Sequence, residues 1–323
     1  MRKVLLATTA LVAMGGVSAA SADITLSGTA SYNYITNSGT GTQGTYQGPG
    51  NAEDVDMSTT VDANIAMSSA LDNGMTISGL VSLDEGGVDD SGWSIAGDFG
   101  TLSFGGTAND GFGATATGLT ADEGITLSTH DGTAAVGTAS TNHAIPYKTV
   151  HNDFIPHSNV SLTLPAVSGF QFGVGITDGA TSAADGTQWG LKYSMEAGSM
   201  TVDVAYASAS TGSSGSDASS AGVTLTMGDA TIVVASNETG TYTADSVGAS
   251  YAVSDALTVQ GYTGSTDKSD TGAYEVEDTA IGLTYTVTTG LSVSVTHNDF
   301  SGKGGDGGAE SGTRTVIALD ATF

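Results

Sequence analysis

Cysteine is absent from this 323-residue chain, and proline and basic residues are scarce. Without cysteine the protein can form no disulfide, so hydrogen bonding and burial alone must hold an exported fold together. The chain has 7 Lys and Arg residues against 34 Asp and Glu residues. Because nucleic-acid interfaces need clustered Lys and Arg, this charge balance argues against nucleic acid as a partner and favours cations. A surface kept soluble by its acidity is the alternative explanation.

The first 22 residues are expected to be a secretory signal peptide. Arg2 and Lys3 give a positive start, an apolar run follows, and residues 20–22 form a small-residue A-x-A cleavage site. An uncleaved anchor is the alternative, but the apolar run is shorter than the ~20 residues of a spanning helix. The domain prediction is therefore a cleaved signal peptide at 1–22 and one folded domain at 23–323.

Helical membrane spans are excluded beyond the signal, because no apolar run there reaches about 18 residues. Gly is frequent, with 47 copies, and the residues between are largely Thr, Val, Ser and Tyr, which favour strands over helices. Short segments alternate apolar and polar side chains, as around Val61 and Ile65, and turn signals such as Asn73-Gly74 separate them. The pattern predicts an all-β protein of about 16 strands.

Three features favour a membrane barrel over a soluble sandwich. Charged residues avoid the apolar faces, as Lys192 and Arg314 do. Long polar connections, the first at about 36–57, alternate with tight turns. Aromatic residues gather near strand ends in two groups, as in the girdles of membrane barrels: Phe99, Phe104, Phe170, Phe172, Tyr251 and Phe323 near tight turns, and Tyr34, Trp93, Trp189, Tyr206, Tyr262 and Tyr274 near long loops.

These features predict a closed, 16-stranded antiparallel transmembrane β-barrel. The even strand number puts both termini on the same side as the tight turns, which we expect to be periplasmic, with the long loops outside. The water-filled lumen is then lined by the polar faces of the strands. The residues expected there include Asp62, Asn64, Gln171, Lys192, Asp203, Gln260 and Thr284.

The two ends of the folded domain carry the most specific pattern. Residues 23–30 read DITLSGTA, and residues 316–323 read VIALDATF, with alternate apolar residues and a terminal aromatic. Together with SVTHNDF at 294–300, they resemble Gram-negative general porins of the alphaproteobacterial type. The resemblance implies a non-enzymatic channel for passive diffusion of small hydrophilic solutes and ions in the cell outer membrane. It also implies a homotrimer among outer-membrane lipids and lipopolysaccharide, with Phe323 as the signal for the barrel-assembly machinery.

The resemblance also implies a role for residues 107–158, a stretch unusually long for a connection in a compact domain. In such porins the third loop folds into the barrel and narrows the pore; an external loop is the alternative. Only three basic residues face the expected constriction, so we predict a weak transverse field and a cation-preferring lumen. The predicted constriction comprises Asp110, Asp122, Glu123, Asp131, Lys148 and Asp153 in the loop, with Lys192 and Arg314 on the wall.

Metal chemistry has few candidates. Four histidines in the loop (His130, His143, His151 and His157) could form a metal site or a proton-sensitive gate, or could be ordinary polar loop residues. Their spacing matches no zinc motif. The tetrapeptide HNDF occurs at 151–154 and 297–300, which allows calcium binding through Asp153 and Asp299. No other cofactor is expected.

Two other functions compete with the diffusion channel. A secreted or surface-anchored β-rich adhesin would share the signal, the acidity and the Gly, Ser and Thr content. A substrate-specific channel for sugars or nucleotides would need aromatic residues along the lumen, for which Tyr262 on a polar face is the candidate. An enzyme is not expected, because no G-x-S-x-G elbow and no converging pair of carboxylates is present.

Overall fold

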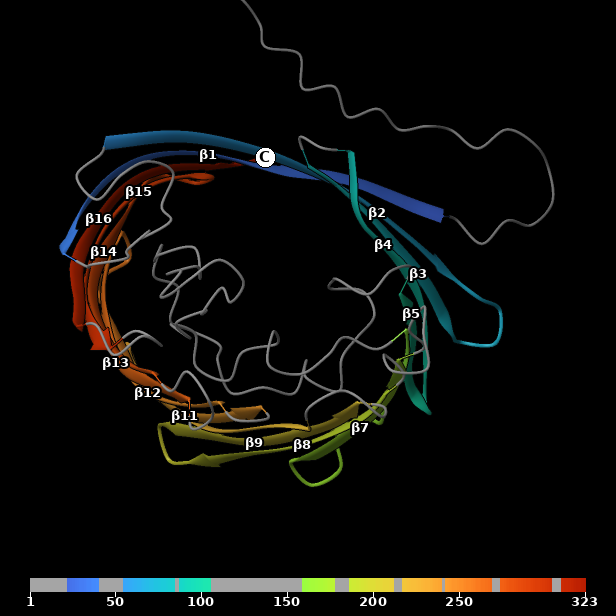
Figure 1. The fold of residues 1–323 in the computed structure, drawn as a ribbon. Coiled ribbons are helices and arrows are strands. Elements are labelled where there is room, and N and C mark those ends of the chain that lie inside the picture. The colour runs from blue at the N-terminus through green and yellow to red at the C-terminus, as the bar shows by residue number, and fades with distance from the viewer. Residues whose placement is uncertain are drawn as a thin grey trace, which may run out of the picture.

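A computed structural model of the chain describes residues 22–40, 55–84, 87–105, 159–177, 186–211, 217–239, 242–268, 274–303 and 309–323. These residues form one closed ring of 16 antiparallel strands, seen along its axis in Figure 1. Each strand pairs with its neighbours in sequence, and pairing of β1 with β16 closes the barrel. In this part of the chain no helix is long and apolar enough to cross a membrane.

The strand bounds are β1 Ala22–Thr40, β2 Val55–Ala70, β3 Thr76–Asp84, β4 Gly87–Gly97, β5 Gly100–Gly105, β6 Val160–Thr163, β7 Phe170–Thr177 and β8 Gly186–Ala197. The second half comprises β9 Met200–Thr211, β10 Ala218–Met227, β11 Ala230–Thr239, β12 Tyr242–Ser254, β13 Leu257–Lys268, β14 Tyr274–Thr288, β15 Leu291–Lys303 and β16 Ala309–Thr322. The predicted strand number and antiparallel order are confirmed.

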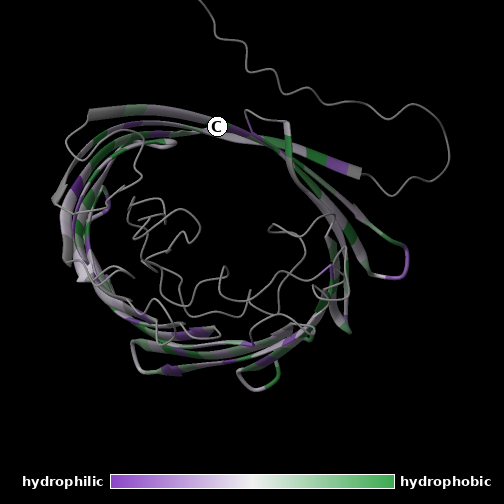
Figure 2. Ribbon diagram, viewed as in Figure 1, coloured by the Kyte–Doolittle hydropathy of each residue, from purple (hydrophilic) through white to green (hydrophobic). Residues whose placement is uncertain are grey.

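The alternation of side chains along each strand gives the barrel wall an outer face that meets lipid and an inner face that meets water. Successive residues of a strand point to opposite faces, and Figure 2 shows hydrophobic and hydrophilic positions alternating along the strands. Large apolar side chains are exposed on the outer face, among them Leu191 at 38 %, Ile281 at 62 % and Leu319 at 44 %. A membrane barrel needs such an exterior because its outer solvent is lipid.

Glycine allows the tightest turns on one side of the barrel. Gly74 follows Asn73 in the turn between β2 and β3, with φ at +81°. Gly100 opens β5 with φ at +111°, and a Cβ there would lie 2.1 Å from the carbonyl oxygen of Thr163 on β6. Both positions therefore require the positive φ that glycine adopts readily, and Gly100 also requires the absence of a side chain.

Several strands are longer than the sequence predicts, on the side away from the tight turns. The stretch of about 36–57 was expected to be a polar connection, but β1 continues to Thr40 and β2 begins at Val55. Likewise β11 reaches Thr239 and β12 begins at Tyr242. Polar residues end the apolar alternation there, but the backbone hydrogen bonds continue. Backbone pairing, unlike side-chain alternation, does not require an apolar face.

The C-terminal residue completes the closure of the barrel. The Phe323 N–H donates to the Gly28 carbonyl oxygen at 3.0 Å, and the Gly28 N–H donates to the Phe323 carbonyl oxygen at 2.7 Å. A Cβ on Gly28 would lie 2.7 Å from the Phe323 ring. Gly28 therefore provides the space in which the terminal ring packs across β1.

Candidate functional site

The inner wall of the barrel is the candidate site, and the strand register organises it into rows. Residues that face each other across neighbouring strands lie on the same side of the sheet. Since Leu191 and Tyr206 are partners on the outer face, Lys192 and its partner Ala205 lie on the inner face. The same argument, continued around the barrel, puts all the predicted lumen residues on the inner face: Asp62, Asn64, Gln171, Lys192, Asp203, Gln260 and Thr284.

The positive charge of Lys192 is balanced by a carboxylate on the next strand. Its Nζ lies 3.9 Å from Oδ1 of Asp203, and the two side chains are 19 % and 22 % exposed. The Ser194 hydroxyl also donates a hydrogen bond to Asp203. Thus Asp203 on β9 is held by two partners on β8, and the positive charge that Lys192 brings to the lumen is largely balanced.

A second polar cluster lies on the inner face of β13, β14 and β15. The Tyr262 hydroxyl donates to the Asp278 carboxylate, and Nδ2 of Asn298 donates to the Tyr262 hydroxyl at 3.3 Å. All three side chains are at least nine-tenths buried. Arg314 on β16 is the direct cross-strand partner of Asn298, so this predicted constriction residue also lies on the inner face, 6 % exposed.

Further polar contacts continue along the wall at the closure of the barrel. The Ser31 hydroxyl donates to Asp320 at 2.7 Å, which joins β1 to β16. The Thr29 hydroxyl donates to Asp62 at 3.2 Å, which joins β1 to β2. These four carboxylates, Asp62, Asp203, Asp278 and Asp320, are therefore distributed around the inner face, and each accepts a hydrogen bond from a hydroxyl of a neighbouring strand.

A row of serines crosses the inner face from β2 to β6. Five successive strands each contribute one serine, and every neighbouring pair is in register: Ser68, Ser78, Ser94, Ser103 and Ser161. The residues are half-exposed at the β2 end of the row and buried at the β6 end, where Ser161 is 2 % exposed. The sequence did not reveal this row, because register between distant strands has no local signal.

The candidate residues of the predicted third loop lie outside the described part of the chain. These are Asp110, Asp122, Glu123, Asp131, Lys148 and Asp153, together with His130, His143, His151 and His157. The structure therefore brings Lys192 and Arg314 to the inner wall without testing the constriction. Residues 1–21, most of the predicted signal peptide, also lie outside that part.

Asp299, one half of the predicted calcium pair, lies on the outer face of β15. Its partners Thr279 and Thr313 are outer-face positions, and its side chain is exposed. His297 lies on the same face, with Nδ1 at 2.8 Å from the Thr315 hydroxyl. No group of three or more His, Asp or Glu suited to a metal ion occurs among the described residues.

Aromatic side chains lie on the outer wall of several strands, among them Tyr32 on β1, Tyr251 on β12 and Tyr285 on β14. Trp93 stacks on Phe104 with ring centroids 4.3 Å apart, and Trp189 lies 5.3 Å from Tyr206. These paired rings lie on β4 and β5 and on β8 and β9. The prediction that Tyr262 belongs to the girdle is wrong and its assignment to the polar face is right, because Tyr262 alternates with outer-face Gly261 and Thr263 and is 5 % exposed.

Comparisons with known proteins agree with this architecture. A family model described as Gram-negative porin matches residues 7–311. The outer-membrane channel DcaP of Acinetobacter baumannii aligns with a TM-score of 0.64 at 13% identity, covering 96% of this chain and 99% of that one. An anion-selective porin from Comamonas acidovorans aligns with a TM-score of 0.62 at 13% identity, covering 94% and 100%. The trimer form of OmpT of Vibrio cholerae gives 0.59 at 14%, covering 94% and 99%. No curated protein matches the sequence.

Proposed function

The chain belongs to the Gram-negative porin family, a family of outer-membrane channels, and we propose that it conducts small hydrophilic solutes and ions by passive diffusion. One observation carries the proposal: a closed barrel of 16 strands has an apolar outer face and an inner face lined by hydroxyl, carboxyl and amide side chains. Barrels of this strand number are wide enough to enclose an aqueous channel. The family consists of channels and not of enzymes.

We propose further that the channel prefers cations. The chain has far more carboxylates than basic residues, and Lys192 is offset by Asp203. Asp62 and Asp320 add carboxylates to the same inner wall, where Arg314 is the other basic residue among the described positions that the sequence predicted there. Charged rings of one sign select for the opposite ion. The predicted constriction, with its acidic loop residues from Asp110 to Asp153, would strengthen the preference.

The assembly proposed for the protein is a homotrimer in contact with outer-membrane lipids and lipopolysaccharide. The OmpT structure described as a trimer supports this at the level of fold. Export through a signal peptide and delivery to the barrel-assembly machinery by the Phe323 strand complete the proposal. Calcium binding by Asp153 stays a prediction. Because Asp299 lies on the outer face, a calcium site shared by Asp153 and Asp299 would have to lie on the outer side of the wall.

The two competing functions have less support. A soluble or surface-bound adhesin would not expose a continuous apolar outer wall. A sugar-specific channel would need several aromatic rings along the lumen, and among the described side chains only Tyr262 faces inward, already hydrogen-bonded to Asp278. We therefore retain the proposal of a general diffusion channel.

Reversal potentials in a planar bilayer test the proposal. The purified protein is incorporated into a membrane that separates two KCl concentrations, and the zero-current potential is measured. A cation-selective sign is expected. An anion-selective sign would refute the preference, and absence of discrete conducting steps would refute the channel itself. Permeability to uncharged solutes of increasing size, measured by liposome swelling, tests passive diffusion independently.

A further inference from the structure

Strand β1 runs further toward the tight-turn side of the barrel than its neighbour β16 does. Its register with β2 begins at Ala22, whereas its register with β16 begins at Thr29. Just before Thr29, two backbone hydrogen bonds join Gly28 to Phe323. Figure 1 shows β1, in blue, continuing past the C-terminus. Among the described residues, 22–27 of β1 therefore have a neighbouring strand on one side only.

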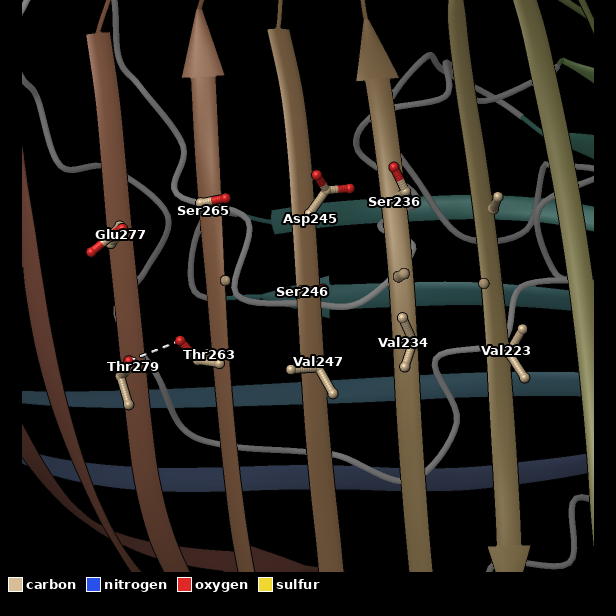
Figure 3. Close-up of a pocket in the computed structure, with 14 residues that line it drawn as sticks. Val223, Val234, Ser236, Asp245, Ser246, Val247, Thr263, Ser265, Glu277 and Thr279 are labelled. Carbon is tan, nitrogen blue, oxygen red and sulfur yellow. Dashed lines mark hydrogen bonds between the residues drawn. The ribbon is translucent and has the colours of Figure 1, made fainter.

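This open edge contrasts with the fully paired wall elsewhere. Figure 3 shows the wall of β10 to β14, where one row of paired residues crosses five strands: Val223, Val234, Val247, Thr263 and Thr279. The strands in the middle of that row have a partner on both sides. An open strand edge, by contrast, presents backbone N–H and C=O groups that can pair with another chain.

The open edge carries the backbone groups of Ile24 and Leu26. Successive residues of a strand point their N–H and C=O groups toward opposite neighbours. Gly28 points both groups toward β16, because both bond to Phe323. Leu26 and Ile24, two and four residues earlier, therefore point theirs the same way, beyond the end of β16. Both residues lie outside the predicted signal peptide at 1–22, so its cleavage would keep them.

The side chains of the same two residues are apolar and exposed. Leu26 is 73 % exposed and Ile24 is 57 % exposed on the outer face. Ile24 precedes Gly28 by four residues, which is about 10 Å along the membrane normal for a strand tilted by about 40°. The Phe323 ring packs at Gly28, and aromatic rings near strand ends mark the membrane interface. The open edge therefore extends from the interface into the periplasm, where lipid does not cover it.

Carboxylates surround this end of the barrel. Exposed acidic residues lie at the start of β1, in the tight turns or beside them: Asp23, Asp72, Asp98, Glu196, Asp229 and Asp255. The tight turns that the structure describes contain no Lys, Arg or His. Charges act over about 10 Å at 0.1 M salt. A partner that binds at this rim is therefore expected to be basic.

We propose that the open edge of β1 binds an extended, basic segment of a periplasmic protein as an added strand. The segment would form hydrogen bonds with both backbone groups of Ile24 and of Leu26. Apolar side chains at alternate positions of the segment would pack beside these two residues on the outer face. A basic side chain on its other face would pair with Asp23.

A folded second copy of the chain is a poor occupant of this edge. Its own rim is acidic, so the two rims would repel each other. In one membrane, neighbouring barrels also turn strands of opposite tilt toward each other, so two β1 strands would cross at about 80°. An extended segment has neither restriction and can lie in line with β16.

Peptide binding to the folded barrel in detergent tests the inference. The probe is a fluorescent heptapeptide that alternates valine with lysine and threonine, and binding is followed by fluorescence anisotropy. Saturable binding is expected. N-methylation of two valines removes backbone donors but keeps side chains and charge, and should weaken the affinity about tenfold. Leu26→Pro removes an N–H at the open edge and no hydrogen bond of the barrel, and should weaken it similarly.

Matched variants separate the edge from general attraction to an acidic protein. Leu26→Ala keeps the N–H and should cost less affinity than Leu26→Pro. Asp23→Asn should weaken binding about twofold, the size of one exposed ion pair, whereas Asp229→Asn removes the same charge from a distant turn and should change nothing. Conductance in planar bilayers should be the same for Leu26→Pro and the wild type, so channel function is tested separately.

Three results would overturn the inference. The first is the absence of saturable binding. The second is binding that survives both N-methylation and Leu26→Pro, which would assign the peptide to the acidic lumen or to the surface in general. The third is an oligomer that dissociates in Leu26→Pro, because a second copy of the chain would then occupy the edge. Band shift without heating confirms that each variant is folded.

Discussion

Replacing Lys192 by Gln should make the channel more cation-selective. The Lys192 ammonium lies 3.9 Å from the Asp203 carboxylate, a distance at which two charges interact by about 1 kcal/mol in water and about 4 kcal/mol at an effective dielectric constant of 20. The substitution leaves the carboxylate without its counter-charge. Asp203 keeps its position, because Ser194 still donates a hydrogen bond to it.

The size of the effect follows from Coulomb attraction in the aqueous pore. A cation that passes about 6 Å from the freed carboxylate gains about 0.7 kcal/mol in water, which raises its local concentration about threefold. The ratio of potassium to chloride permeability should therefore rise two- to fourfold at about 0.1 M salt, where charges act over about 10 Å. In about 1 M salt the range falls to about 3 Å, and the difference should nearly vanish.

Reversal potentials of four channels provide the measurement. Asp203→Asn should shift selectivity toward anions, and the double variant should return close to the wild type. Asp299→Asn, at an exposed position on the outer face of β15, is the charge control. An unchanged or lower cation preference in Lys192→Gln at low salt would refute the view that the pair lines the conducting path.

Two further substitutions and one deletion test the wall itself. Tyr262→Phe removes a buried hydroxyl that bonds to Asp278 on β14 and Asn298 on β15, and should destabilise the barrel by about 1–3 kcal/mol in urea unfolding. Tyr251→Phe, on the outer face at 53 % exposure, should change the midpoint little. Gly100→Ala would put a methyl group 2.1 Å from the Thr163 carbonyl oxygen and should sharply reduce the yield of folded, heat-modifiable protein. A normal yield would contradict the close approach of β5 and β6. Deletion of Phe323 removes two closure hydrogen bonds and should slow assembly into liposomes, measured by band shift without heating; assembly at the wild-type rate would count against its role.

Local periodicity was sufficient to predict the strands and their faces. Val61 and Ile65 repeat every second residue, so the side of β2 that meets lipid can be read without knowing its neighbours. The tight turns were predictable for the same reason, since Asn73-Gly74 carries its backbone conformation in its own sequence. The inner-face positions of Lys192 and Arg314 follow from the same alternation.

Features that depend on register between strands were not predictable. Tyr262 was assigned both to the girdle, by its distance from the strand end, and to the lumen, by its polar face; alternation along β13 puts it inside, and only the register shows that Asp278 is its partner. The serine row arises only when separate strands are aligned, and a shift of one residue would destroy it. The strand ends were also missed, because polar extensions of hairpins resemble loops in sequence.

The hydrogen bond between Ser31 and Asp320 joins residues 289 positions apart. Holding the ends of so long a segment together costs about 5 kcal/mol of chain entropy before any closing contact is made. Until β16 arrives, β1 presents an unpaired edge that could add strands from other molecules. Every partly closed intermediate of the barrel therefore has an open strand edge. Only the pairing of β16 with β1 removes that edge from Thr29 onward and, with it, the risk of aggregation through it.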